Sequence, residues 1–138
     1  MKANQLKTAV TLFTIFIAAG AIAQDKIIRK EILTADVGTR LIRKVDVREI
    51  DFHPGQKNGY HKHPCPVLSY IISGTVLFQV EGDTLKTLKA GDVLFEPANT
   101  PIVHYDNASQ TEPLKFIAYY LINKEQVLIE MLPPKSKG

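Results

Sequence analysis

The chain has a single cysteine, Cys65, among its 138 residues, so it cannot form an internal disulfide. A clear excess of charge is missing too. Lysine and arginine total 17 against 14 aspartates and glutamates. Two of the positive charges, Lys2 and Lys7, belong to an N-terminal segment that we expect to be removed, which leaves 15 against 14. This balance gives no reason to expect nucleic acid or an acidic membrane surface as a partner.

Long apolar runs are absent after residue 23. The run before it, Ala9–Ala23, carries no charge, follows two lysines and ends in Ala-Ile-Ala. A positive start, a short apolar stretch and a small-x-small end are typical of a secretory signal peptide, whereas a membrane span needs about 20 apolar residues. We therefore expect cleavage of residues 1–23 and a bacterial periplasmic or secreted protein, residues 24–138, without a membrane span. An uncleaved anchor is the alternative.

Convincing helical periodicity is lacking before Lys124. Short alternating or β-branched stretches are instead separated by turn signals roughly every 8–12 residues, as in sandwiches and barrels. The sequence therefore predicts an all-β fold with one small barrel in residues 24–138. Asn123–Leu132 has weak helical character, and a C-terminal tail is expected over about residues 124–138. Strands are expected at Ile42–Phe52, Val67–Ile72, Thr75–Glu81, Thr84–Leu88, Val93–Phe95, Ile102–Tyr105 and Leu114–Leu121.

Two histidines stand two residues apart in the frame Gly55-x5-His61-x-His63-x10-Gly74. On a strand, residues i and i+2 point to the same face. Imidazole is the commonest metal ligand in proteins. Side by side on the inner face of a barrel, His61 and His63 would make half of a metal site; lining a metal-free pocket is the alternative.

This frame resembles the first motif of the cupin superfamily, Gly-x5-His-x-His-x3-Glu-x6-Gly. The segment Gly91–Asn99 is similar to the start of the second motif, Gly-x5-Pro-x-Gly-x2-His-x3-Asn. Together the motifs run from Gly55 to about Asn107, nearly half of the expected mature chain. The resemblance implies a cupin-type β-barrel, also called a double-stranded β-helix or jelly roll.

The departures from these motifs concern the metal ligands. The glutamate of the first motif falls on Val67. The glycine of the second falls on Asn99, which tolerates a left-handed turn, and its histidine falls on Ile102. His104 lies two residues further on and, by strict alternation, shares the face of Ile102; a hydrogen-bonded wall histidine is the other reading. The resemblance thus implies a carboxylate-free ligand set of His61, His63 and His104.

Apolar and aromatic positions indicate a small-molecule pocket inside the barrel. Cys65 continues the alternation of the histidines and stays open as a metal ligand, a buried small side chain or a reactive thiol. Glu96 is expected to face outward. No glycine-rich phosphate loop is visible, so a flat or apolar organic ligand fits better than a phosphate compound. The expected lining is Cys65, Val67, Tyr70, Phe78, Phe95, Ile102 and Tyr119, with Ile72, Phe116 and Tyr120 as further interior positions.

Two functions remain open. In one, iron, copper, zinc, nickel or manganese beside the organic ligand acts as Lewis acid or oxygen activator of an enzyme such as a dioxygenase or isomerase. In the other, the protein binds or senses a small molecule in the periplasm without metal or turnover. A general base beside the histidines would favour an enzyme, and the sequence offers none; the fold alone does not decide. The resemblance also implies a homodimer.

Overall fold

The computed structural model describes residues 26–134, and all regular secondary structure in this part is β-strand. The predicted all-β fold is therefore confirmed, whereas the helical character expected at Asn123–Leu132 is wrong. The predicted signal peptide lies outside the described residues. The nine strands are β1 (Lys44–Phe52), β2 (His61–Lys62), β3 (Val67–Ser73), β4 (Thr75–Val80), β5 (Lys86–Lys89), β6 (Val93–Glu96), β7 (Ile102–Asn107), β8 (Leu114–Ile122) and β9 (Glu130–Met131).

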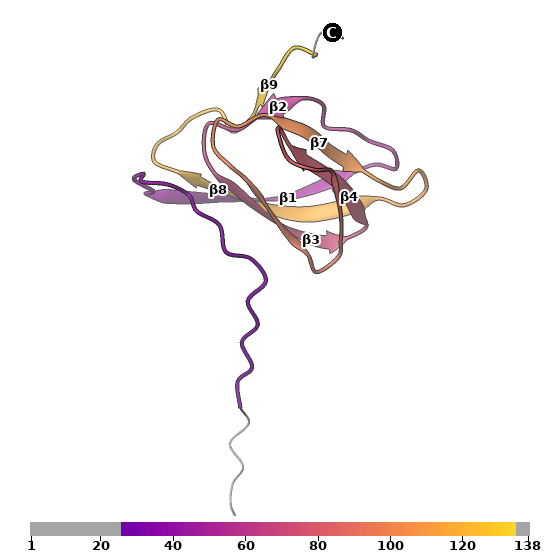
Figure 1. Ribbon diagram of the computed structural model, residues 1–138, viewed down its shortest axis with the longest axis horizontal. Helices are drawn as coiled ribbons and strands as arrows, with labels where there is room; N and C mark the ends of the chain where they lie inside the picture. Colours follow the sequence, from indigo (N-terminus) through magenta and orange to yellow (C-terminus); the bar gives the residue numbers. More distant parts are fainter. Residues whose placement is uncertain (1–25, 135–138) are drawn as a thin grey trace, which may run out of the picture.

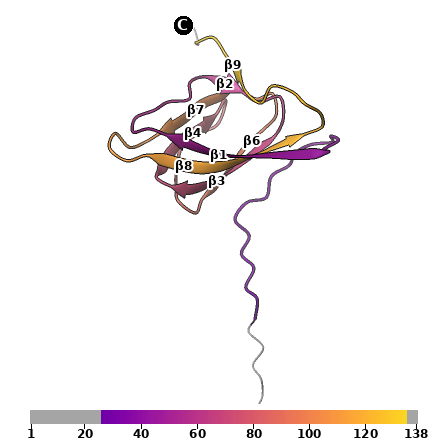
Figure 2. The ribbon, with the colours of Figure 1, turned by 180° about the vertical axis from the view of Figure 1, so that it is seen from behind.

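The strands form two antiparallel sheets that face each other (Figures 1 and 2). One sheet has the order β1-β8-β3-β6 and the other β5-β4-β7-β2-β9. Apart from the β4–β5 hairpin, successive strands lie in opposite sheets, so the chain crosses between the layers again and again. This is the jelly-roll arrangement that the sequence predicts. Within residues 26–134, no helix offers the length and apolarity that crossing a membrane requires.

The core fills the space between the sheets. In β8 every second side chain is buried, from Leu114 to Ile122, and β4 and β6 alternate in the same way. Period-two burial places one face of each strand against the opposite sheet. Other core side chains come from both sheets, among them Phe52, Ile71, Val76 and Leu94.

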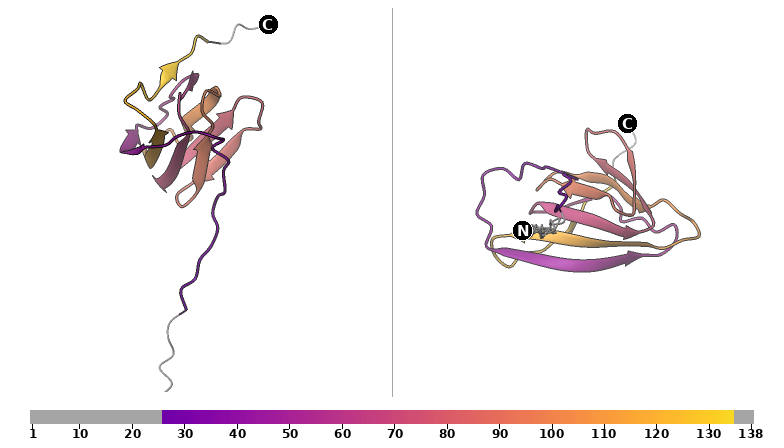
Figure 3. Two further views of the ribbon diagram at one scale, coloured as in Figure 1. Left: turned by 90° about the vertical axis from the view of Figure 1, so that its left-hand side faces the viewer. Right: turned by 90° about the horizontal axis from the view of Figure 1, so that it is seen from below.

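Segments outside the strands lie at both ends of the described chain. Residues 26–32 run away from the barrel (Figure 3), whereas Leu33, Ala35 and Val37 line a pocket with Phe95 of β6. At the other end, β9 pairs with β2. The region predicted as a C-terminal tail is therefore tied to the barrel next to the histidines.

Candidate metal centre

Two facing sheets bring three polar side chains together inside the barrel. His61 lies on β2, His63 follows that strand directly, and Glu96 ends β6. Backbone pairing of His61 with Ile102 on β7 and Met131 on β9 holds β2 in place. The exposed fractions are 0% for His61, 4% for His63 and 2% for Glu96. Burial of three polar groups side by side requires that each be paired.

The potential ligand atoms converge on a single point. One carboxylate oxygen of Glu96, Oε2, lies 3.5 Å from His61 Nε2 and 3.1 Å from His63 Nε2. The two imidazole rings are 5.1 Å apart and nearly perpendicular, at 83°. One ligand atom from each of the three residues lies within 4.8 Å of the others. These residues therefore form a compact, inward-facing donor set.

Backbone carbonyls fix the orientation of both rings. His61 Nδ1 lies 2.7 Å from the Gly59 carbonyl oxygen, and His63 Nδ1 lies 2.5 Å from that of Leu128. A carbonyl oxygen only accepts, so both Nδ1 atoms must donate. The neutral rings then carry their lone pairs on Nε2, the atoms that face Glu96. This is how outer hydrogen bonds prepare metal-ligating histidines elsewhere.

The three inward atoms are all acceptors. Asn58 Nδ2 lies 3.3 Å from His61 Nε2 and can donate to it, which leaves His63 Nε2 and Glu96 Oε2 as two acceptors that face each other. A bound cation or a shared proton satisfies these two atoms, so in metal-free protein a proton lies between His63 and Glu96. The pKa values agree with that view. Burial alone would lower the pKa of His63, but the hydrogen bond and negative charge of Glu96 outweigh it and raise this pKa. For Glu96, burial raises the pKa, but the hydrogen bonds from His61 and His63 prevail and lower it.

The spacing also fits a metal ion. Two ligands that each bind zinc at about 2.0–2.1 Å lie roughly 3.3 Å apart in a tetrahedral site. The separations of 3.5 Å and 3.1 Å between Glu96 Oε2 and the two Nε2 atoms bracket this value. Imidazole with one carboxylate suits zinc, iron, nickel and manganese alike, so the donor set does not select one of them.

Glu96 does not face outward, contrary to the sequence-based expectation. In β6 the inward positions are Leu94 and Glu96, so Phe95 takes the outer face. Glu96 lies directly opposite Val67 in the pairing of β6 with β3. Val67 is the position at which the first cupin motif has its glutamate. The carboxylate missing from one strand is thus supplied by its neighbour across the ladder.

His104 is not part of this cluster within the described residues. Its Nδ1 lies 2.7 Å from Asp106 Oδ2, and its side chain is 41% exposed. The cause is a β-bulge in β7: Gln79 pairs with His104, but the next residue of β4 pairs with Ile102. The extra residue breaks the alternation, so Ile102 and Tyr105 face inward while His104 does not. The expectation that two steps preserve the face fails here.

The turn of the second motif behaves as predicted. Asn99 has a φ of 58° and is the one non-glycine residue with positive φ in the described chain. Asparagine tolerates this left-handed conformation better than most residues. Its backbone N–H donates to the carbonyl oxygen of His63 at 2.7 Å. The turn therefore ties the second motif to the histidine segment.

A cavity of about 190 Å³ adjoins the three donors. None of the seven residues expected to line the ligand pocket borders it. Sequence reasoning did place two of its walls, Phe116 and Tyr120, inside the barrel. Its lining comprises Ile50, Phe52, Asn58, His61, His63, Glu96, Tyr105, Phe116, Ala118, Tyr120 and Ile129.

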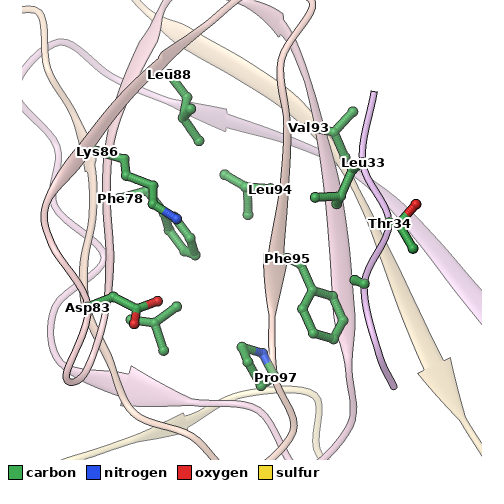
Figure 4. Close-up of a pocket in the computed structure, with 12 residues that line it drawn as sticks. Leu33, Thr34, Phe78, Asp83, Lys86, Leu88, Val93, Leu94, Phe95 and Pro97 are labelled. Carbon is green, nitrogen blue, oxygen red and sulfur yellow. The ribbon is translucent and has the colours of Figure 1, made fainter. Parts of the chain in front are cut away.

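The structure places the seven expected residues elsewhere. Val67 and Ile102 are core side chains. Tyr70, like Ile72, is exposed, and Tyr119 alternates with the inward residues of β8. Phe78 and Phe95 line a second cavity, of about 360 Å³, at the gap between β5 and β6 (Figure 4). In that view Phe78 lies beneath Lys86, while Phe95 lies on the side of the N-terminal segment.

Cys65 is buried and outside the donor cluster. It borders a separate pocket that includes Arg40 and Gln126. Burial raises the pKa of its thiol, which keeps it protonated and weakly reactive. Of the three readings left open for Cys65, this placement favours the buried small side chain.

A family comparison agrees with the fold and the first motif. The family model described as "Cupin domain" (Cupin_2) matches residues 48–120. The chain belongs to the cupin family. The match contains the histidines, Glu96 and most of the strands, so the resemblance inferred from the two motifs is confirmed. No curated protein matches this cupin.

Solved structures similar to this cupin include proteins of different activity. A DMSP lyase, DddQ from Ruegeria pomeroyi, is 19% identical with a TM-score of 0.58; the match covers 67% of this chain and 45% of the lyase. A cupin-like protein from Thermotoga maritima is 27% identical with a TM-score of 0.52 and 64% of each chain covered. Oxalate decarboxylase from Bacillus subtilis, which has Mn(II) centres, is 24% identical with a TM-score of 0.53 and coverages of 64% and 24%.

These similarities establish the fold. This cupin spans less than half the length of the lyase and about a quarter of the decarboxylase. Neither activity therefore transfers to it through the fold.

Proposed function

We propose that this cupin binds a divalent transition metal through His61, His63 and Glu96, and a small organic molecule in the adjoining cavity. The observation that carries the proposal is the convergence of three buried acceptors whose rings are already fixed by backbone carbonyls. A metal ion satisfies all three atoms at once; without metal, the Asn58 amide serves His61 Nε2 and a shared proton serves His63 and Glu96. The manganese centres of the related decarboxylase support a metal in this fold.

The ligand set described here differs from the neutral one expected from sequence. A carboxylate adds a negative charge, which increases affinity for hard divalent ions. When bound, such a metal supplies Lewis acidity or activates oxygen. The chain's own residues orient the ligand and keep water out, through the aromatic walls Phe52, Phe116 and Tyr120.

An enzyme that transfers protons needs a general base, and the cavity offers few candidates for one. The cavity's remaining titratable side chains are Tyr105 and Tyr120. Burial, reinforced by the charge of Glu96, raises the pKa of Tyr120 to about 12 and that of Tyr105 well above 10. Both are neutral near pH 7 and donate hydrogen bonds instead of removing protons. This supports oxidation by a dioxygenase over isomerisation, which needs a base. Binding or sensing without turnover is the alternative.

The first experiment measures metal uptake. The protein, expressed without its first 23 residues and stripped by chelation, is titrated calorimetrically with Mn(II), Fe(II), Ni(II), Zn(II) and Cu(II). We expect one ion per chain. Glu96→Gln keeps the side-chain size but removes the charge, and should weaken binding by tens-fold or more.

His104→Gln is the matched control, because it changes a histidine that the structure places outside the cluster. It should leave the affinity unchanged. Loss of binding in His104→Gln together with normal binding in Glu96→Gln would restore the ligand set expected from sequence. If the wild-type protein takes up none of these ions, the metal-free binding protein becomes the better reading.

We also propose that the protein is exported from the cytoplasm. The charge-free run Ala9–Ala23 and its Ala-Ile-Ala end support a periplasmic or secreted location. Metal would then be loaded in that compartment or during transit to it.

A further inference from the structure

Among the described residues, one tyrosine in the wall of the cavity has a buried hydroxyl without a hydrogen-bond partner. Tyr105 lines the cavity and is only 2% exposed, yet its hydroxyl makes no hydrogen bond within the described residues. The hydroxyl of Ser69, on β3, is also buried and unpaired. Buried polar groups are almost always satisfied, so an unpaired one needs an explanation such as a missing ligand.

The surroundings of Tyr105 hold its ring in place. It packs against Phe52, Phe78 and Phe116, with ring centroids 6.0, 5.9 and 4.9 Å away. A ring held on several sides cannot turn its hydroxyl toward solvent. The ring is therefore fixed in the cavity wall, and its buried hydroxyl makes no hydrogen bond within the described residues, which costs stability.

The hydroxyl is a donor that stays neutral. Burial, and then the charge of Glu96, raise the pKa of Tyr105; Ser69 offsets part of this rise, although the two hydroxyls do not meet hydrogen-bond geometry. A neutral phenol beside a carboxylate-bearing site favours an acceptor oxygen as its partner.

The net charge of the metal site restricts the charge that a ligand can carry. A divalent ion held by two neutral histidines and Glu96 leaves one positive charge in a buried site. Among residues 26–134, no lysine or arginine lines the cavity. A monoanion therefore neutralises the site, whereas a dianion would leave a buried negative charge without a partner. The volume of about 190 Å³ lies below the roughly 300 Å³ at which drug-sized pockets begin.

We propose that Tyr105 is a specificity-determining donor for a small monocarboxylate with a short apolar body, which binds beside the metal and accepts a hydrogen bond from the Tyr105 hydroxyl. This inference rests on the proposed metal site, because the metal supplies the charge that the carboxylate neutralises. The apolar body lies against Phe52, Phe116 and Ala118, which form part of the cavity wall.

The test uses metal-loaded protein and simple probes. Acetate, propionate, butyrate and benzoate are titrated against malonate, succinate, butanamide and butanol, with affinity measured by calorimetry. We expect the monocarboxylates to bind and the dianions and neutral compounds to bind at least tenfold more weakly. Tyr105→Phe should weaken monocarboxylate binding by roughly ten- to a hundredfold, the effect of one hydrogen bond to a charged group.

Tyr119→Phe is the control, because Tyr119 loses the same hydroxyl from an outward position on β8. It should leave binding unchanged. The Tyr105→Phe protein without ligand should be as stable as wild type or slightly more so, since an unpaired buried hydroxyl is removed.

Three outcomes with metal-loaded or ligand-free protein would overturn this inference alone. Metal uptake without monocarboxylate binding overturns it while the metal site stands. Equal monocarboxylate affinity in Tyr105→Phe and wild type shows that the hydroxyl does not contact the ligand. A clear loss of stability in ligand-free Tyr105→Phe shows a structural partner instead. Failure to take up metal is seen separately, in the metal titration, and overturns both proposals.

Discussion

Glu96 adds a buried negative charge to the histidine pair. A site made of neutral imidazoles binds a proton or a metal only through lone pairs, whereas the buried carboxylate adds a charge that must be balanced. Its oxygen Oε2 contacts both rings. Proton and metal therefore compete for one place, and the occupancy of that place depends on pH.

The metal-free protein should show this competition in its thermal stability. The pKa of His63 is raised, so its contribution is complete below the ordinary value of 6.5 and is lost as the pH rises through the raised one. The pKa of Glu96 is lowered, so its contribution is complete above 4.5 and is lost as the pH falls through the lowered one. We expect the pair to stabilise the metal-free protein most between about pH 4.5 and 6.5.

Thermal unfolding midpoints in chelator between pH 4 and 9 measure this dependence. Metal should stabilise most at the alkaline end, where no proton opposes it. Glu96→Gln removes the charge that raises the His63 pKa, so the decline above pH 6.5 should shrink. A wild-type midpoint that rises steadily from pH 6 to 9 without metal would contradict the coupling.

At the scale of single strands, the alternation of polar and apolar residues predicts where strands lie, but not always which face of a strand points inward. It placed β1 and β3 to β8 to within two residues at both ends of each strand, and it placed the inward pair His61 and His63. It could not say which face of a four-residue strand points inward, because Phe95 and Glu96 compete for the core on opposite faces. Burial of a charge is unfavourable unless partners exist, and the partners of Glu96 lie on β2 and directly after it, far away in the sequence.

The bulge in β7 could not be predicted from the sequence either, because it depends on how β7 pairs with β4. One additional residue in a ladder reverses every later side chain, and nothing in Ile102–Tyr105 marks it. The cavity walls depend on these local choices of face. The motif spacing therefore sufficed to predict the fold and the donors His61 and His63. The third donor, Glu96, and the residues that line the cavity could be identified only once the pairing of the strands was known.

Gly74 illustrates how closely two elements approach. It joins β3 to β4 with a φ of +84°, and a Cβ there would lie 2.5 Å from the Pro113 carbonyl oxygen and 2.9 Å from Leu114 Cα. Both are backbone atoms, which cannot move aside easily. Gly82, in the next turn, has a similar φ of +89° but open space around its Cα.

Replacing each glycine by alanine should separate backbone strain from collision. Gly82→Ala should cost about 1–2 kcal/mol, the penalty of a left-handed non-glycine residue. Gly74→Ala should cost clearly more, about 3 kcal/mol or above, because strain and a clash with β8 add. Urea denaturation gives both values; equal losses would mean that the chain at Pro113 relaxes freely.

For the whole molecule, the open edges of the sheets matter. β1 is the outer strand of its sheet, with nine residues and one unpaired side. Its outward Val45 and Val47 are about half exposed. Five of its nine residues are charged, which protects an edge strand from pairing, but the strand is long and exposes these two valines, so we expect a second copy of the chain to cover it.

Antiparallel pairing of two β1 strands about Val47 is self-complementary. Asp46 of each copy then lies opposite Arg48 of the other, which favours the pair. We expect sedimentation to show a dimer, and Val47→Lys to produce monomers because two lysines would meet at the symmetry axis. The control is Leu85→Lys, which alters a residue of similar exposure, 51% against 54%, in the β4–β5 turn. It should remain dimeric. A wild-type protein that is monomeric at every concentration would show that β1 tolerates solvent, with its charged residues protecting the edge.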